Sequence, residues 1–341
     1  MEKILITGGA GYIGSHTAVA LLEAGYQPII IDDFSNSEKS ALLGLKKITG
    51  QDIPCYEGDC NDAKLMDRIF TENKLSGVIH FAAFKAVGES SMLPLKYYTN
   101  NISSLLVLLA IMNQHNVENL VFSSSCTVYG QPDKLPVKES TPRKKAESPY
   151  GNTKKICEDI LVDQVNSKVA LSAIALRYFN PIGAHTSSLI GELPLGVPSN
   201  LVPFVTQTGV GIRKELTVFG DDYDTPDGTC VRDYIHVMDL AEAHVKAISH
   251  LKGKEAPFYD IFNVGTGNGN TVMDVIKAFE KVSGKSLNYK VGPRRPGDVV
   301  KVWADTAKIN QELDWKARFN LEEALRDSWN WQLALSEKKS Y

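Results

Sequence analysis

The sequence predicts an α/β protein, with a doubly wound parallel sheet of Rossmann type and a second, smaller α/β substrate lobe. Short apolar runs alternate with helical runs through the first half of the chain, which is typical of a parallel sheet with helices on both faces. A glycine-rich turn lies between the first apolar run and the first helical run. After residue 180 the chain becomes rich in Gly, Pro and Asn, which indicates a separate, loop-rich lobe.

The expected elements follow one another along the chain. The strand-like runs are Ile4–Ile6, Pro28–Ile31, Val78–Phe81, Leu120–Ser124 and Phe258–Val264. The helical runs are Ser15–Ala24, which Gly25 closes, the segment around Leu105–Leu109, and Asp239–His250. We therefore expect a Rossmann domain over residues 1–180, to which the chain returns around 231–265, and the second lobe over residues 181–341.

The charge balance and the cysteines exclude several classes of protein. Lys and Arg number 37 against 40 Asp and Glu, so no basic face for a nucleic acid is expected. The five cysteines are widely spaced and form no Cys-x-x-Cys pair, which favours free thiols over disulfides or a metal site. No signal peptide precedes Ile4, and the longest apolar stretch, Leu105–Met112, is too short to span a membrane. These features predict a cytoplasmic protein with no membrane, nucleic-acid or metal partner.

The glycine turn has the spacing of a dinucleotide-binding loop. Gly8, Gly11 and Gly14 let the backbone turn tightly and approach a pyrophosphate, and the following helix offers its free N–H groups and positive end. Tyr12 and Ile13 belong to the same turn. Many strand-to-helix turns need glycine, so this motif alone is weak.

Two carboxylates follow the second expected strand. Asp32 and Asp33 stand where an acidic residue can accept hydrogen bonds from an adenosine ribose and repel a 2′-phosphate, which favours NAD over NADP. The alternative is that they begin a turn before Ser35 and Asn36.

A serine, a tyrosine and a lysine form the candidate catalytic set. The strand Leu120–Ser124 runs into Ser125, and Tyr150 and Lys154 share one face of a helix that Ser148 is expected to cap. A free tyrosine has a pKa of about 10, so a base needs a lower value. Lys154, the helix N-terminus and a nearby cationic nicotinamide could lower it. The alternative is a surface Tyr/Lys pair.

Motifs along nearly the whole chain carry a family resemblance. They are residues 7–16, 84–90, 123–130, 176–181, 231–236 and 294–298. Together with the glycine turn and the Tyr/Lys pair, they resemble the extended short-chain dehydrogenase/reductase family and, within it, the UDP-glucose 4-epimerases, also called UDP-galactose 4-epimerases.

The resemblance implies a role for each matching residue. Tyr150 is the acid/base at the sugar 4-hydroxyl, Ser125 hydrogen-bonds that oxygen, and Lys154 holds the nicotinamide ribose. The implied NAD contacts are Gly8, Gly11, Tyr12, Ile13, Gly14, Asp32, Asp33, Asn36, Asp59, Cys60, Phe81, Ala82, Lys85, Asn100, Ser125, Tyr150, Lys154 and Tyr178. The implied UDP-sugar contacts are Ser125, Tyr150, Asn180, Asn200, Phe219, Arg232, Arg295, Asp298 and Val302. Arginine forks suit a diphosphate, although any one of them could instead form a surface ion pair.

The implied activity is NAD-dependent epimerisation at C4 of UDP-hexoses through a 4-keto sugar. Val302 stands four residues after Asp298, where a small side chain in this family leaves room for N-acetylated sugars. UDP-GlcNAc and UDP-GalNAc are therefore expected as additional substrates, unless Val302 is a core strand residue. The family also implies a homodimer through helices near residues 95–115 and 150–166.

Three other functions are alternatives to epimerisation for this sequence. A 4,6-dehydratase of the same family needs an acidic pair beside its Ser/Thr, whereas Cys126 and Thr127 follow Ser125 here. A simple dehydrogenase would exchange its cofactor at each turnover. A catalytically silent NAD-sensing protein would be expected to lack the Tyr/Lys pair.

Two further motifs are expected to be structural. The loop Gly265–Gly269 resembles a second phosphate loop, but Thr271 and Asp274 predict a capped helix start there. The acidic segment Asp221–Gly228 lacks the ligand spacing of a calcium loop.

Overall fold

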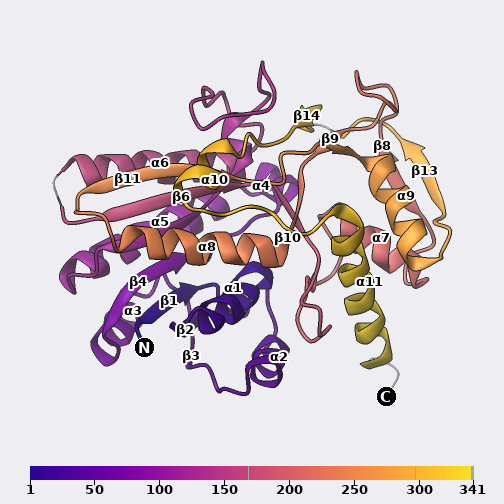
Figure 1. Cartoon of the computed structure of the whole chain (residues 1–341). Coiled ribbons are helices and arrows are strands. Elements are labelled where there is room, and N and C mark those ends of the chain that lie inside the picture. Colours follow the sequence, from indigo (N-terminus) through magenta and orange to yellow (C-terminus); the bar gives the residue numbers. More distant parts are fainter. Residues whose placement is uncertain (168, 296, 339–341) are drawn as a thin grey trace.

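A seven-stranded parallel sheet lies at the centre of the larger lobe (Figure 1). The computed structural model describes residues 1–167, 169–295 and 297–338. The strand order is β11-β6-β5-β4-β1-β2-β3. The strands are β1 (Lys3–Thr7), β2 (Gln27–Asp32), β3 (Cys55–Glu57), β4 (Leu75–His80), β5 (Asn119–Ser125), β6 (Ser172–Tyr178) and β11 (Phe258–Val264). The sheet winds outward from β1 in both directions, which confirms the predicted doubly wound Rossmann fold.

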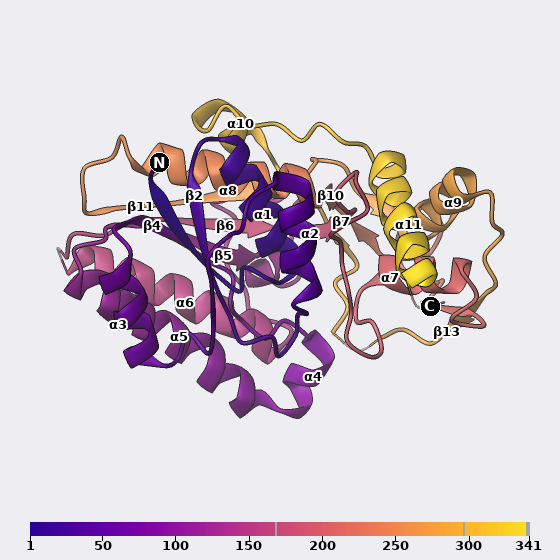
Figure 2. The same cartoon turned by 90° about the horizontal axis from the view of Figure 1, so that it is seen from below.

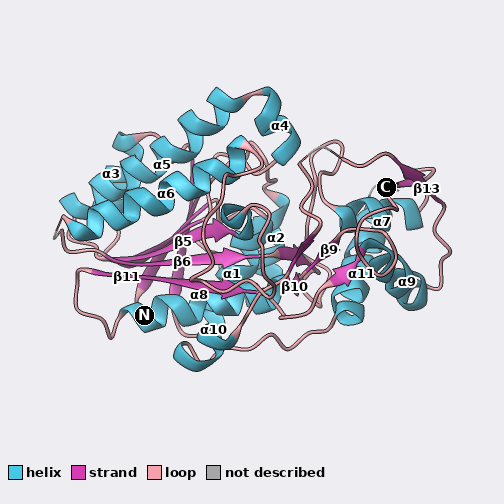
Figure 3. Ribbon diagram, turned by 90° about the horizontal axis from the view of Figure 1, so that it is seen from above, coloured by secondary structure: helices cyan, strands magenta, loops and turns pink. Residues whose placement is uncertain are grey.

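Two helical layers cover the sheet (Figure 3). Alternate residues of each strand face each layer. Ile4 and Ile6 of β1 pack into one apolar cluster and Leu5 into the other, as the period of two in a strand requires. One layer holds α1 (Tyr12–Glu23), α2 (Ser40–Thr49), α8 (Val237–Leu251) and α10 (Ala307–Glu312). The other holds α3 (Ala63–Glu72), α5 (Pro94–Gln114) and α6 (Pro149–Asn166), with the short α4 (Val87–Met92) before α5.

The observed start of each helix can be compared with the start that the sequence predicted. The predicted cap of α6 is confirmed, since Ser148 Oγ accepts a hydrogen bond from Gly151 N at 3.1 Å. Helix α1 was predicted to begin at Ser15 but begins at Tyr12. The prediction was late because Gly14, which looked like the last residue of the turn, already lies in the first helical turn.

The smaller lobe stands beside the sheet (Figures 1 and 2). Its apolar core joins three helices to a two-stranded parallel sheet, and the Phe279 and Trp329 rings meet edge to face with centroids 5.3 Å apart. The elements are α7 (Leu201–Gly209), β8 (Leu216–Phe219), α9 (Val272–Ser283), β13 (Tyr289–Gly292) and α11 (Leu321–Lys338).

Short strands mark the places where the chain crosses between the lobes. They are β7 (Asn180–Ile182), β9 (Val231–Arg232), β10 (Tyr234–His236), β12 (Asn270–Thr271) and β14 (Lys301–Val302). After β10 the chain returns to the large sheet as α8 and β11, and α10 packs there again after β14. Across the described residues, no helix combines the length and apolarity that a membrane span requires.

Candidate active site

The residues predicted to bind NAD and the reacting sugar carbon gather at the carboxyl edge of the parallel sheet. Gly8 follows β1, Phe81 follows β4, Ser125 ends β5 and Tyr178 ends β6. The strand order reverses at β1, between β2 and β4, so the loops after β1 and β4 diverge there. Ligands of open α/β sheets bind at such a switch point.

The glycine turn is shaped so that a ligand's phosphates can come close to the backbone. Gly8 has φ +69°, and a Cβ on Gly14 would lie 2.3 Å from the carbonyl oxygen of Gly8. Gly11 is the N-cap of α1, and among the described residues no side chain caps that helix end. The first backbone N–H groups of α1 are thus available to an anion, which fits the pyrophosphate of a dinucleotide.

The Asp32 carboxylate ties the end of β2 to the glycine turn. Its Oδ2 accepts from Ala10 N at 2.9 Å, and its Oδ1 accepts from Phe34 N at 2.9 Å and from Ser37 Oγ at 2.7 Å. An ionised carboxylate has about four acceptor positions, so there is room for one more donor, such as a ribose hydroxyl. Asp33 is exposed and accepts from Ser35, so it also shapes the turn that leads to the exposed Asn36.

Further along the same edge, Asp59, Cys60 and Asn100 lie near one another. Asn61 Nδ2 donates to Asp59 Oδ1 at 2.8 Å and to Asn100 Oδ1 at 3.3 Å. Burial raises the pKa of Cys60 to about 12, so its thiol is neutral.

Phe81 and Ala82 follow β4 directly. Ala82 N donates to Thr7 Oγ1 at 3.2 Å, and the Phe81 ring contacts His244 with centroids 4.6 Å apart.

Lys154 is buried beneath the serine-rich strand end, so the alternative of a surface Tyr/Lys pair is wrong. Its Nζ donates to the Ser123 carbonyl at 2.6 Å and lies 4.9 Å from the Phe122 ring centroid. The Ser123 and Tyr178 hydroxyls are 2.5 Å apart. Helix α6 therefore presents Tyr150 and Lys154 to the ends of β5 and β6.

Burial dominates the protonation of the Tyr/Lys pair. Burial raises the pKa of Tyr150 well above its usual value, the nearby Tyr178 raises it further, and the Ser125 hydroxyl lowers it in part. Burial lowers the pKa of Lys154 to about 8. The lowered tyrosine pKa predicted from Lys154 and the helix end is therefore not found in the chain by itself. Tyr150 needs a further positive charge beside it before it can act as a base near neutral pH.

The Ser125 hydroxyl is oriented by the residue two positions along the chain. Ser125 caps the short 3₁₀ helix Cys126–Tyr129, and its Oγ accepts from Thr127 N at 3.2 Å and from Thr127 Oγ1 at 3.0 Å. Since its acceptor positions are used in this way, the serine proton remains to be donated. Thr127 was not among the predicted site residues, although the Ser-x-Thr spacing is a signal for such a cap.

Two arginines and a carboxylate form a charged group in the smaller lobe. Arg295 Nη2 donates to Asp298 Oδ1 at 2.7 Å, and Arg232 Nη2 lies 3.8 Å from the same oxygen. Phe219 of β8 is 42% exposed, with the Arg295 guanidinium 5.8 Å from its ring centroid. The pair of cations beside an open aromatic face suits a diphosphate attached to a planar base.

Asn180, Asn200 and Lys85 lie between the two lobes. Asn180 is in β7, and its N–H donates to the Asp233 carbonyl at 3.0 Å. Asn200 Nδ2 donates to Glu192 Oε1 at 2.6 Å, and Lys85 Nζ lies 3.6 Å from the same oxygen. Glu192 was not predicted, because no motif marks it.

Val302 is 4% exposed and lies in β14, so it is the core strand residue that the alternative interpretation describes. It belongs to a small apolar cluster with Val128 and Tyr129, which follow Ser125 closely in the chain, and with Phe179.

Comparison with known proteins decides the family. A family model described as GDP-mannose 4,6 dehydratase matches residues 5–328. The UDP-glucose 4-epimerase of Bacillus subtilis is 51% identical over 329 residues, covering 96% of each chain. That of Dictyostelium discoideum is 49% identical over 331 residues, covering 97% of this chain and 96% of the relative. The chain belongs to the UDP-glucose 4-epimerase family.

Solved structures of this epimerase family match the whole architecture. The UDP-glucose 4-epimerase of Bifidobacterium longum, in complex with NAD+ and UDP, has a TM-score of 0.94 and 49% identity over 97% of this chain and 98% of that chain. The enzyme of Stenotrophomonas maltophila, with bound NAD and formylated UDP-arabinopyranose, has a TM-score of 0.96 and 44% identity, covering 99% of this chain and 100% of that one.

The loop that resembles a second phosphate site binds a carboxylate of the chain itself, which confirms the structural interpretation. The buried Asp233 accepts from Thr266 N at 2.8 Å, from Gly267 N at 3.1 Å and from Ala304 N at 3.2 Å. The capping box of Thr271 and Asp274 is also confirmed. Within the described part of the chain, no group of His, Cys, Asp and Glu is placed to hold a metal ion.

Proposed function

We propose that this chain is an NAD-dependent UDP-hexose 4-epimerase that interconverts UDP-glucose and UDP-galactose. The observation that carries the proposal is the position of Tyr150 and Lys154 on α6, facing the end of β5 at the same edge of the sheet from which the uncapped α1 starts. A hydroxyl acid/base thus stands where a dinucleotide would lie. Relatives of about half-identical sequence carry the same enzyme name over nearly their full length.

NAD fits the residues at the switch point. The glycine turn and the start of α1 would hold its pyrophosphate, Asp32 and Asp33 its adenosine ribose, and Lys154 its nicotinamide ribose. The remaining contacts that we assign to NAD are Asn36, Asp59, Cys60, Phe81, Ala82, Lys85, Asn100 and Tyr178. Bound NAD supplies an acceptor for the C4 hydride and gives that hydride back within the same turnover.

Tyr150 moves the proton of the sugar 4-hydroxyl. It takes this proton as C4 is oxidised to the ketone and returns it as C4 is reduced. Ser125 donates a hydrogen bond to the same oxygen, since Thr127 occupies the acceptor side of its hydroxyl. The buried Lys154 lies beneath this strand end, and the positively charged nicotinamide of bound NAD would add the further charge that a Tyr150 phenolate needs.

The UDP group anchors the sugar while the hexose turns. We assign this anchor to Arg232, Arg295, Asp298, Phe219, Asn180 and Asn200. Epimerisation needs hydride loss from one face of C4 and return to the other, so the 4-keto hexose must rotate without leaving. Binding energy from the distant nucleotide retains the intermediate and leaves the ring free to turn.

Incubation of the purified protein with UDP-galactose and no added NAD tests the proposal. The expected product is UDP-glucose, formed with retained cofactor. A requirement for stoichiometric NAD would instead indicate a dehydrogenase, and a 4-keto-6-deoxy sugar nucleotide would indicate a dehydratase. The residues Cys126 and Thr127 beside Ser125 carry no carboxylate, which argues against elimination of water.

We propose that the chain forms a homodimer and acts in the cytoplasm. Leu95 and Leu106 of α5 are 77% and 49% exposed, and Val162 of α6 adds a further exposed apolar side chain. Contacts between these helices of two copies would cover them. All five cysteines are free, which suits a reducing compartment.

A further inference from the structure

The glycine turn is joined to the smaller lobe by one phenol group. Tyr12 is the first residue of α1, directly after the N-cap Gly11, and its hydroxyl donates to the Gly183 carbonyl at 2.7 Å. Gly183 follows β7, where the chain crosses between the lobes. The bond therefore connects the turn assigned to the NAD pyrophosphate with the boundary of the other lobe.

The Tyr12 side chain is held in place by its own helix. Its ring meets the ring of His16, one turn further along α1, edge to face with centroids 5.3 Å apart. Burial lowers the pKa of His16 to about 3, and the neutral imidazole donates from Nδ1 to the Tyr12 carbonyl at 2.7 Å. Burial, and after it the Glu192 carboxylate, raises the pKa of Tyr12 well above its usual value. Its hydroxyl thus stays protonated and can donate to Gly183.

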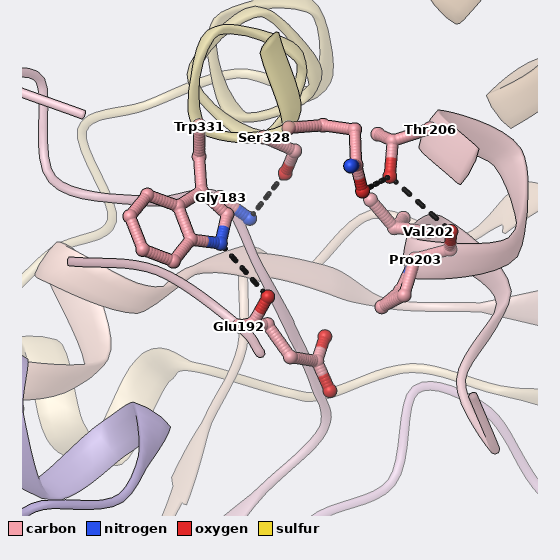
Figure 4. A pocket seen from close by; sticks show the side chains of 8 residues that line it. Gly183, Glu192, Val202, Pro203, Thr206, Ser328 and Trp331 are labelled. Atoms are coloured by element: carbon pink, nitrogen blue, oxygen red, sulfur yellow. Dashed lines mark hydrogen bonds between the residues drawn. The ribbon is translucent and has the colours of Figure 1, made fainter. Parts of the chain in front are cut away.

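Gly183 is held from the opposite side by the smaller lobe. Its N–H donates to Ser328 Oγ of α11 at 2.9 Å, as Figure 4 shows. Its φ of +96° favours glycine, and a Cβ there would lie 2.8 Å from His236 Nε2. The His236 ring in turn stacks on the Phe319 ring, with centroids 4.2 Å apart. The carbonyl that Tyr12 binds is therefore fixed to α11 and to the segment before it.

Strand β7 leads from this bond to a residue that we assign to the UDP-sugar. Asn180 is the first residue of β7, and its N–H donates to the Asp233 carbonyl at 3.0 Å. Ile182 of the same strand belongs to the apolar core of the smaller lobe. A shift of Gly183 relative to α1 would therefore move a proposed UDP-sugar contact relative to the NAD turn.

We propose that Tyr12 is a positioning residue that sets the distance between the NAD-binding turn and the UDP-binding lobe. The inference rests on the proposed function, in which NAD lies at the start of α1 and the nucleotide of the substrate is anchored in the smaller lobe. Hydride transfer between ligands held by different lobes depends closely on how those lobes are placed. The Tyr12 hydroxyl acts through Gly183, and the backbone N–H of Tyr12 remains available to a phosphate.

Tyr12→Phe should slow hydride transfer more than it weakens binding. The variant keeps the ring against His16 and removes only the bond to Gly183. We expect kcat for UDP-galactose to fall by about tenfold, while the Kd for UDP and the NAD content of the purified protein stay within about twofold. With UDP-galactose that carries deuterium at C4, the isotope effect on kcat should rise, because hydride transfer then limits the rate more strongly. A loss of stability alone would leave this isotope effect unchanged.

Ser328→Ala tests the other half of the connection. Tyr12 and Ser328 hold Gly183 in series, so either substitution alone should release it, and combining them should lower kcat by less than about twofold further. Tyr26→Phe is the matched control, because the hydroxyls of Tyr26 and Ser249 bond at 2.8 Å within the larger lobe, beyond the other end of α1. It should leave kcat and the isotope effect unchanged.

Hydrogen exchange measured by mass spectrometry follows the connection without the reaction. In the NAD-containing protein with UDP, residues 180–184 should exchange faster in Tyr12→Phe than in the wild type, because Gly183 has lost one of its two anchors. In Tyr26→Phe the exchange of this segment should equal that of the wild type.

The outcomes separate this inference from the proposed function. A normal kcat and isotope effect in Tyr12→Phe, or losses that multiply fully in the double variant, would overturn the positioning role. A low kcat that added NAD restores would overturn it too, since Tyr12 would then act on cofactor binding. A wild type that binds UDP and NAD but does not convert UDP-galactose would overturn the proposed function. Hydrogen exchange would still decide whether Tyr12 holds the lobes, and equal exchange in the wild type and Tyr12→Phe would show that it does not.

Discussion

Tyr150 is the side chain on which the proposed chemistry depends most directly. Tyr150→Phe removes the hydroxyl that carries the proton and changes the volume little. We expect kcat to fall by about 10² or more, as the loss of a positioned acid/base group commonly causes. NAD should still co-purify, since its other contacts are intact. Stopped assays with UDP-galactose measure the rate, and near-normal turnover would remove Tyr150 from the mechanism.

Val302 is a core strand residue, so we propose that it affects the substrate range only through the side chains that it packs against. Its cluster partners Val128 and Tyr129 lie just after Ser125, so its size can affect space near the sugar. We predict that the wild type converts UDP-GalNAc to UDP-GlcNAc and that Val302→Tyr loses this activity while keeping UDP-galactose conversion. Because Val302 is buried, a bulky substitution also strains the packing, and UDP-galactose turnover is the internal control. Equal conversion of UDP-GalNAc by both proteins would contradict the prediction.

At the scale of the element, α6 joins the proposed catalytic pair, Tyr150 and Lys154, to a buried ion pair. Glu158 stands one turn beyond Lys154, and its carboxylate binds Arg177 at 2.8 and 2.6 Å and Ser124 Oγ at 2.6 Å. Ser124 precedes Ser125 and Arg177 precedes Tyr178. The ion pair therefore ties α6 to the two strand ends that carry site residues.

Breaking this ion pair should be costly. In Glu158→Gln the Arg177 guanidinium remains buried without its counter-charge, and we expect the free energy of unfolding to fall by about 3–5 kcal/mol. The exposed pair Lys281–Glu322 is the control, for which Glu322→Gln should cost about 1 kcal/mol or less. Urea unfolding measures both. A loss in Glu158→Gln no larger than the control's would contradict the prediction.

Local signals predicted the elements well and the contacts between distant segments poorly. The apolar run Phe258–Val264 and the Ser148 cap of α6 were predicted correctly, because both depend on neighbouring residues alone. The start of α1 was missed because a glycine in the first helical turn resembles a glycine in the loop before it.

Some residues of the candidate site could be predicted from local motifs, and others could not. The spacing of Ser125, Tyr150 and Lys154 is one that the family motif marks. In the structure the three residues lie at the carboxyl end of β5. Glu192 could not be predicted, since its partner Lys85 belongs to another lobe and its backbone is fixed by Trp331. Such contacts exist only after the two lobes have packed together.

At the scale of the whole molecule, buried histidines make stability depend on pH. Burial lowers the pKa of His16 and His80 to about 3 and that of His244 to about 4. An unfolded histidine has a pKa of about 6.5, so as the pH falls the unfolded chain binds protons before the folded chain does. The stability that these residues contribute above about pH 6.5 is therefore lost progressively as the pH falls, down to about pH 4 for His244 and to about pH 3 for His16 and His80.

We predict that the free energy of unfolding falls on acidification from about pH 7 to about pH 5.5, by about 1 kcal/mol for each of these histidines. Urea unfolding at both pH values measures the loss. His244→Leu removes one titrating group, so its loss over the same range should be smaller than that of the wild type by about 1 kcal/mol. An identical pH dependence in the two proteins would contradict the assignment of a neutral, buried His244.

In the proposed epimerisation, the hydrogen removed from C4 returns to C4 of the same sugar. UDP-galactose carrying deuterium at C4 tests this claim directly when it is converted in ordinary water without added NAD. We predict UDP-glucose that keeps its deuterium at C4, because the hydride stays within the site throughout one turnover. Mass spectrometry and proton NMR of the product measure the label. Product that carries solvent-derived hydrogen at C4 would contradict this mechanism.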